Sequence, residues 1–127
     1  MSEKTVAQKL RIKEHQRVLL VNEPQGYKQS IGQLPPNVSV MSEPKTTADI
    51  IQLFVTSRSD LEKNLGKLKT LLAPSGAQWV TYPKRTSKIK SDINRDTIYE
   101  YAQSIGLQGI AMISVDDTWS ALRLKIV

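Results

Sequence analysis

The chain has 127 residues, of which 39% are hydrophobic and 24% charged, so it can form one soluble globular domain but not two with separate cores. The absence of cysteine excludes disulfides, thiolate metal sites and thiol catalysis. Eighteen Lys and Arg residues against 12 Asp and Glu give a formal net charge of +6, which favours anionic partners.

Residues 1–16 are predicted as a polar lead-in to the domain. The first fifteen residues contain no apolar stretch of the kind found in signal peptides. No apolar run in the chain approaches the roughly 18–20 residues that a membrane-spanning helix needs. We therefore expect a cytoplasmic protein without a membrane partner, with a single α/β domain over residues 1–127.

The first strand is predicted at residues 17–22, where a run of Val and Leu is closed by a proline and a glycine. Such a run is typical of a strand buried on both faces. Residues 27–31 have room for one or two helical turns, and residues 38–41 form a weak short strand. The link 42–49 is too short for a helical crossover. The weak strand therefore either loops back into the sheet or is not a strand.

A helix is predicted between two apolar strands at residues 50–55 and 77–82. Ser59 and Glu62 have the spacing of a capping box, in which two side chains satisfy free backbone N–H groups of the first helical turn. A stripe of leucines at helical intervals follows, and a proline and a glycine end it. The stripe consists of Leu61, Leu65, Leu68 and Leu72.

The last third of the chain predicts one more helix and a hairpin. The helix begins at residue 92 or 94 and ends at residue 105, just before Gly106. Residues 110–115 are a third strongly apolar strand. Residues 120–126 alternate between apolar and polar side chains, which is the period of a strand with one wetter face. The short polar segment between these two strands predicts a hairpin turn.

Strands that alternate with helices of this length predict a mostly parallel sheet covered on both faces. The terminal hairpin adds an antiparallel strand. The expected fold is therefore a three-layer α/β domain with a C-terminal antiparallel hairpin. The connections 56–76 and 83–108 are long enough for right-handed crossovers between parallel strands, which need a dozen residues or more.

The order of elements from residue 50 onward resembles the second half of class I S-adenosylmethionine-dependent methyltransferases, whose last strand is also antiparallel. Three motifs are also similar to those of a family of small bacterial proteins of unknown function, and this resemblance covers nearly the whole chain. It implies a reduced, Rossmann-like methyltransferase fold without an established activity. The motifs are Val-Leu-Leu-Val-Asn-Glu-Pro from Val18, Trp-Val-Thr-Tyr-Pro-Lys from Trp79 and Val-Asp-Asp-Thr-Trp-Ser-Ala-Leu-Arg from Val115.

The resemblance implies a cofactor site in the loop after the first strand. Methyltransferases have a Gly-x-Gly-x-Gly sequence there, and an acidic residue at the end of their second strand. This chain has a single glycine in the loop, and Glu43 lies two residues beyond the acidic position. The third strand and helix of the family do not fit into the link 42–49. These departures favour a reduced cleft over S-adenosylmethionine binding. The candidate cofactor-binding residues are Asn22, Glu23, Pro24, Gly26, Tyr27 and Glu43.

Ligands of open α/β sheets bind beyond the carboxyl ends of the strands. We therefore expect a small pocket between the loops that begin at Asn22 and Tyr82, with Tyr27 or Tyr82 as a stacking face. The alternative is that Pro24 and Gly26 only form a tight turn before a short helix.

A second candidate site is the basic loop, which we define as residues 84–95. Its five cations are accompanied by one acid, Asp92, so its charge is +4. The loop leads into a helix N-terminus, where free N–H groups also attract anions. It has none of the aromatic side chains that nucleic-acid sites usually place among cations. A solvated loop without a partner is the alternative. The cations are Lys84, Arg85, Lys88, Lys90 and Arg95.

No catalytic residue, metal site or known catalytic motif emerges from the sequence. The interpretation we favour is a non-catalytic ligand-binding or regulatory module on a reduced methyltransferase-like fold, with a small anionic ligand as its partner. One alternative is an active S-adenosylmethionine-dependent methyltransferase. The other is a nucleic-acid-binding protein that uses the basic loop.

Overall fold

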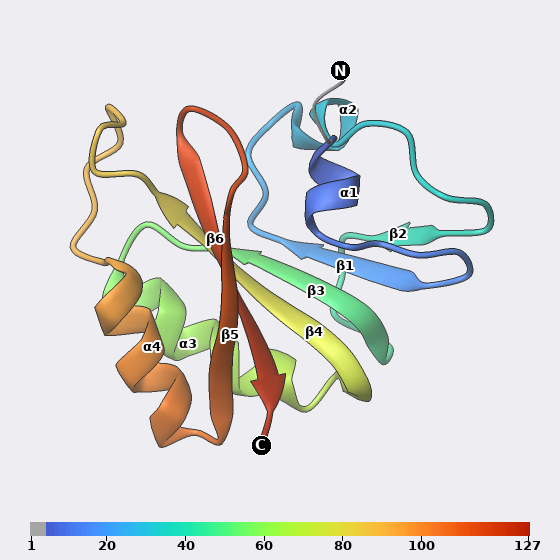
Figure 1. Cartoon of the computed structure of the whole chain (residues 1–127). Helices are drawn as coiled ribbons and strands as arrows, with labels where there is room; N and C mark the ends of the chain where they lie inside the picture. The colour runs from blue at the N-terminus through green and yellow to red at the C-terminus, as the bar shows by residue number, and fades with distance from the viewer. Residues whose placement is uncertain (1–4) are drawn as a thin grey trace.

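The computed structural model describes residues 5–127, which form a six-stranded sheet with helices on both faces (Figure 1). The strands are β1 (Arg17–Val21), β2 (Ser39–Met41), β3 (Ala48–Phe54), β4 (Leu72–Pro83), β5 (Leu107–Ser114) and β6 (Trp119–Ile126). Their order in the sheet is β2-β1-β3-β4-β6-β5. Strands β1 to β4 are parallel, and β6 is antiparallel to both β4 and β5. The predicted mostly parallel α/β fold with a C-terminal antiparallel hairpin is confirmed.

Two longer helices, α3 (Arg58–Lys69) and α4 (Arg95–Ser104), cover one face of the sheet. Side chains alternate along a strand, so Leu19 of β1, Leu53 of β3 and Val80 of β4 all point to this face. They pack with Leu61 of α3 and Ile98 of α4, and none of the five is exposed. Burying each of these side chains stabilises the fold by roughly 1.5–3 kcal/mol.

The opposite face is covered by two four-residue helices, α1 (Val6–Lys9) and α2 (Tyr27–Ser30). Trp79 of β4 is buried on this face and donates its indole N–H to the carbonyl of Leu10 at 3.2 Å. The segment predicted as a polar lead-in thus contributes Ala7, Leu10 and Ile12 to the core. These few apolar residues lie among charged ones in the sequence, so the segment has no apolar run that predicts a core element. Residues 1–4 lie outside the described part of the chain.

The first turn of α3 begins two residues earlier than the predicted capping box. Ser57 is the N-cap, and its hydroxyl accepts a hydrogen bond from the backbone N–H of Asp60 at 3.1 Å. The prediction that Ser59 and Glu62 form a capping box is therefore wrong. Oε1 of Glu62 instead lies 3.7 Å from Nε of Arg58, which is one turn earlier on the exposed side of the helix.

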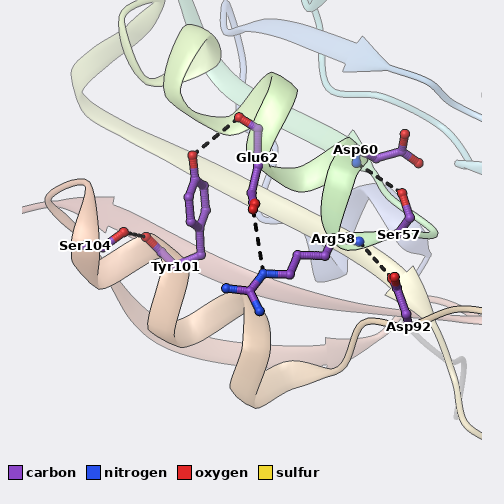
Figure 2. Close-up of polar contacts among 7 residues, drawn as sticks. All are labelled: Ser57, Arg58, Asp60, Glu62, Asp92, Tyr101 and Ser104. Carbon is purple, nitrogen blue, oxygen red and sulfur yellow. Dashed lines mark hydrogen bonds and ion pairs between the residues drawn. The ribbon is translucent and has the colours of Figure 1, made fainter.

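Figure 2 shows two further contacts that tie α3 to the α4 side of the molecule. Asp92, just before α4, accepts a hydrogen bond from the backbone N–H of Arg58 at 2.8 Å. The hydroxyl of Tyr101 on α4 donates to the carbonyl of Glu62 at 3.3 Å. The N-terminus of α3 is thus capped both by its own Ser57 and by a carboxylate from the basic loop.

The weak strand predicted at residues 38–41 is present as β2, so the alternative in which the chain loops back into the sheet is the one observed. It pairs in parallel with β1 at one edge of the sheet. The chain then passes through residues 42–47 to β3 on the other side of β1, without a helix. This connection is sufficient because β2 is only three residues long. It contains neither the third strand nor the helix that methyltransferases have at this point.

Strand β5 lies at the opposite edge of the sheet, whereas its apolar sequence resembled a buried strand. Ile110 is 45% exposed and Met112 is 50% exposed. Helix α3 also ends before Leu72, which belongs to β4. Within residues 5–127 every helix is too short or too polar to cross a membrane.

Candidate functional site

The carboxyl ends of β1, β3 and β4 lie along one edge of the sheet, where two loops extend from it. Figure 1 shows them as the light-blue segment between β1 and α2 and the gold loop between β4 and α4. The strand order reverses between β1 and β3, because β2 pairs on the outer side of β1. Open α/β sheets bind ligands at such a reversal point. The two candidate sites therefore lie along the edge that this rule selects.

A cavity of about 330 Å³ lies at the end of β1, and we call it the β1-end cavity. Four of the six predicted cofactor residues line it, whereas Asn22 and Glu43 do not. Asn22 is exposed directly after β1, and Glu43 is exposed and forms an ion pair with Lys45 at 2.8 Å. The lining residues are Glu23, Pro24, Gln25, Gly26, Tyr27, Lys28, Gln29 and Ser42.

Ser42, rather than Glu43, is the residue after β2 that reaches this cavity. Its hydroxyl accepts a hydrogen bond from Nζ of Lys28 at 2.6 Å. Sequence reasoning missed both residues, because their positions depend on how α2 packs beside the end of β2.

Glu23 has an unsatisfied acceptor in the β1-end cavity. Its Oε2 is hidden from solvent and has no hydrogen-bond partner. A buried polar atom without a partner is uncommon and often marks a missing ligand or water. Gly26 has φ of +84° and no atom within 4 Å of where a Cβ would stand, so the space above its backbone is open. The cavity is thus lined by a carboxylate residue with one unsatisfied oxygen and by an accessible backbone.

Tyr27 supports the cavity instead of offering a stacking face to a ligand. Its ring is 4% exposed and packs edge-on against Phe54, with 4.7 Å between ring centroids. Its hydroxyl donates to Oε1 of Gln52 at 2.7 Å, and Nε2 of Gln52 donates to Oγ1 of Thr81 at 2.9 Å. Burial raises the pKa of Tyr27 well above its usual range, so the hydroxyl remains a donor. This series of hydrogen bonds fixes the start of α2 to the centre of the sheet.

A second cavity, of about 440 Å³, lies between the basic loop, the start of α4 and strand β5. We call it the basic-loop cavity. Three of the five predicted cations line it: Lys84, Arg85 and Arg95. Lys88 and Lys90 line an adjoining hollow of about 720 Å³ inside the loop. The remaining residues of the basic-loop cavity are Tyr82, Thr86, Asn94, Asp96, Met112 and Ser120.

The structure does not form the single pocket that was expected between the loops beginning at Asn22 and Tyr82. Tyr27 lines the β1-end cavity, whereas Tyr82 lines the basic-loop cavity. The reason is the strand order, since β3 lies between β1 and β4 and holds the two loops apart.

The charge of the basic loop is poorly neutralised. The only acid within it, Asp92, accepts from the backbone of Arg58 and so serves α3. Nε of Arg95 lies 3.6 Å from Asp96, but both side chains are largely exposed, so this ion pair is weak. Within residues 5–127, no carboxylate is at ion-pair distance from Lys84 or Arg85. Nζ of Lys84 donates to the hydroxyl of Ser114 at 2.6 Å.

Tyr82 is a buried residue that lines this cavity. The residue is 7% exposed, and its hydroxyl donates to the thioether of Met112 at 3.3 Å. Burial raises the pKa of Tyr82, with Arg95 opposing this and Asp96 adding to it. The hydroxyl is therefore protonated at neutral pH, and a thioether is a weak acceptor for it.

No metal centre is formed by the part of the chain that the structure describes. Within residues 5–127, no group of three or more His, Cys, Asp or Glu side chains could hold a metal ion.

No protein-family model matches this chain, and no curated protein matches it in sequence. Solved structures do match it. The DhpI–SAH complex has a TM-score of 0.66 at 13% identity, with 95% of this chain and 82% of that chain covered. The TehB-like SAM-dependent methyltransferase from Corynebacterium glutamicum has a TM-score of 0.62 at 11% identity, with 98% and 89% covered.

The mitomycin 7-O-methyltransferase MmcR also matches, with a TM-score of 0.66 at 8% identity and 96% of this chain covered. The match covers 53% of MmcR, so this chain spans about half the length of that protein. At such identities the matches show the fold. The chain has a methyltransferase-like Rossmann fold, as the resemblance of its elements predicted.

The matches contradict the non-catalytic module that the sequence favoured. They cover nearly the whole chain and include complexes with SAH and with SAM, so the methyltransferase alternative has the better support. The prediction relied on the missing glycines and on the missing third strand. Neither is needed for the reversal of strand order beside β1, which remains in this shortened sheet. The resemblance to the small bacterial family rests on the three motifs alone, and no family model or sequence match supports it.

Proposed function

We propose that this protein is an S-adenosylmethionine-dependent methyltransferase that binds its cofactor in the β1-end cavity. The observation that carries the proposal is the match of 95% of the chain to a structure solved with SAH. A related complex with SAM matches over 94% of the chain. SAM and SAH are the methyl donor and its demethylated product, so both ends of a transfer reaction are represented among the structures with this fold.

The location and size of the β1-end cavity support this assignment. It lies where the strand order reverses, which is the usual place for a nucleotide-like ligand in an open α/β sheet. Its volume of about 330 Å³ falls at the lower end of the roughly 300–1,000 Å³ typical of small-molecule pockets.

Glu23 is the acid that we assign to the cofactor, in place of Glu43. Glu23 lines the cavity and its Oε2 has no hydrogen-bond partner, whereas the carboxylate of Glu43 is exposed and paired with Lys45. A carboxylate there would accept hydrogen bonds from ribose hydroxyls, and the open backbone at Gly26 would allow close approach. Because Glu23 belongs to the first of the three motifs, we extend the proposal to the small bacterial family that shares them.

The cofactor supplies the methyl group from a positively charged sulfonium. The residues of this chain would bind and orient the two reactants, and holding them in line supplies much of the rate acceleration in such a transfer. Tyr27 contributes indirectly, since its hydrogen bond to Gln52 fixes the loop that carries Glu23.

Isothermal titration of the full chain with SAM and with SAH tests the proposal. We expect both to bind the wild type, and Glu23→Gln to weaken SAM binding about tenfold, which corresponds to about 1.4 kcal/mol for a charged hydrogen-bond partner. Glu43→Gln removes the same charge from an exposed position and is the matched control, with an expected change below twofold. Absence of heat with both compounds would overturn the function. Equal losses in the two variants would overturn the role of Glu23.

A further inference from the structure

The basic-loop cavity is separate from the proposed cofactor cavity and is built for a different ligand. We propose that it binds the phosphate group of a small organic phosphate. Three features of the cavity support this: cations converge on it from two elements, the hydroxyl of Tyr82 lacks a good acceptor, and the lining residues form an open hollow of small-molecule size.

The cations reach the cavity from two sides. Lys84 and Arg85 follow β4, and Arg95 is the first residue of α4. Of the two carboxylates nearby, Asp92 is hydrogen bonded to the N-terminus of α3, and Asp96, which also lines the cavity, forms only a weak, exposed ion pair with Arg95 at 3.6 Å. A phosphate group offers several charged oxygens, and guanidinium groups bind two of them at once. An anion here would therefore satisfy Lys84 and Arg85, which have no carboxylate at ion-pair distance within residues 5–127. It would also compete with Asp96 for Arg95.

Neutral donors complete the site. Tyr82 lines the cavity and its hydroxyl has only a thioether as acceptor, so a phosphate oxygen would be the better partner. The ten-residue helix α4 begins at the cavity, and its N-terminal dipole favours negative charge. Thr86 and Ser120, which both carry a hydroxyl group, also line the space.

The shape of the cavity favours a small molecule over nucleic acid. Its volume is about 440 Å³. The ring of Tyr82 is buried, and the basic loop has no aromatic residue, so no stacking platform for bases is exposed beside the cations. Lys88 and Lys90 in the adjoining hollow extend the positive field and would attract the ligand towards the cavity.

This site is independent of cofactor binding. A protein that binds phosphate here but not SAM would retain this inference and lose the proposed function. If both proposals hold, the phosphate belongs to the molecule that accepts the methyl group.

NMR titrations of the full chain with inorganic phosphate and with phenyl phosphate test the inference. We expect both to bind, with phenyl phosphate at least as tight, and to shift the amide signals of the basic loop and of the first turn of α4. The double variant Arg85→Gln/Arg95→Gln should weaken binding at least tenfold. Tyr82→Phe removes only the hydroxyl and should weaken binding about fivefold.

The matched control is Lys63→Gln/Lys67→Gln, which removes two exposed charges from α3. Its affinity should stay within twofold of the wild type, and all variants should melt within a few degrees of it. The inference is overturned if the wild type binds neither compound, if inorganic phosphate alone binds, or if the control loses as much affinity as the Arg variant. It is also overturned if a short single-stranded oligonucleotide binds the cations more tightly than phenyl phosphate, because the site would then recognise nucleic acid.

Discussion

At the scale of single residues, the chain of hydrogen bonds from Tyr27 through Gln52 to Thr81 connects the loop of the proposed cofactor cavity to the sheet. All three residues are buried, and Gln52 and Thr81 have no exposed surface. Inside a protein a satisfied polar chain fixes geometry, whereas a broken one leaves a group without a partner. The interaction of Tyr27 with Gln52 should therefore affect both stability and cofactor binding.

Tyr27→Phe removes the donor and leaves Oε1 of Gln52 buried and unpaired. We expect the free energy of unfolding at neutral pH to fall by about 1–3 kcal/mol, measured by urea denaturation. Tyr101→Phe is the matched control, because that hydroxyl makes a longer, exposed hydrogen bond of 3.3 Å. Its cost should stay below about 0.5 kcal/mol. A Tyr27→Phe variant as stable as this control would show that the hydrogen bond adds nothing.

The same substitution has a signature at high pH. The folded-state pKa of Tyr27 lies above the unfolded value of 10.0, so folding favours the protonated hydroxyl. This contribution is fully present below about pH 10 and is lost as the pH rises from there towards the folded pKa. The stability of the wild type should therefore fall above pH 10 more steeply than that of Tyr27→Phe. Parallel curves for the two proteins would contradict the buried position of this hydroxyl.

Some residues of the two sites can be identified from the sequence and others cannot. The loop after β1 and the basic loop are recognisable because glycine, proline and clustered charge break the apolar pattern. Gln52 and Thr81 are not, since each looks like a defect in an apolar strand until the sheet places them beside Tyr27. The position of Glu43 was hidden for a similar reason, because only the path of residues 42–47 shows that it is exposed and does not line the β1-end cavity.

At the scale of elements, periodicity located α3 and α4 but missed α1 and the start of α3. Two serines are in suitable places, and their sequence context favours Ser59, which has Glu62 three residues later. The structure selects Ser57, because the chain leaves β3 in an extended conformation and reaches the first helical turn sooner. Likewise, an apolar run such as β5 cannot distinguish a central strand from an edge strand, since strand order is set by tertiary pairing.

The two serines provide a direct comparison. Ser57→Ala removes the acceptor for the N–H of Asp60 and should lower the free energy of unfolding by about 1 kcal/mol, within the 0.5–2 kcal/mol usual for a lost N-cap. Ser59→Ala changes an exposed position inside the first turn and should be nearly neutral, since alanine is the better helix former. Thermal and urea unfolding of both variants measure the difference. The reverse ranking would restore the capping box of Ser59 and Glu62.

At the scale of the whole molecule, two apolar cores share one sheet. The core under α3 and α4 and the core under α1 and α2 take alternate side chains from the same strands, as Val80 and Trp79 of β4 do. If the sheet unfolds, the side chains of both cores are exposed, because both cores pack on the same strands. The prediction that residues 1–127 form a single domain therefore implies that both cores unfold together.

Two spectroscopic probes can test this, because they report on opposite layers. Both tryptophans, Trp79 and Trp119, belong to the core under α1 and α2. The longer helices α3 and α4 dominate the helical signal in far-UV circular dichroism and lie on the other face. We expect urea transitions followed by fluorescence and by circular dichroism to have the same midpoint and the same slope. Trp119→Phe, which leaves Trp79 as the only tryptophan, should show the same coincidence at a lower midpoint. A fluorescence transition that precedes the loss of helix would mean that the layer of short helices, which carries the proposed cofactor cavity, unfolds on its own.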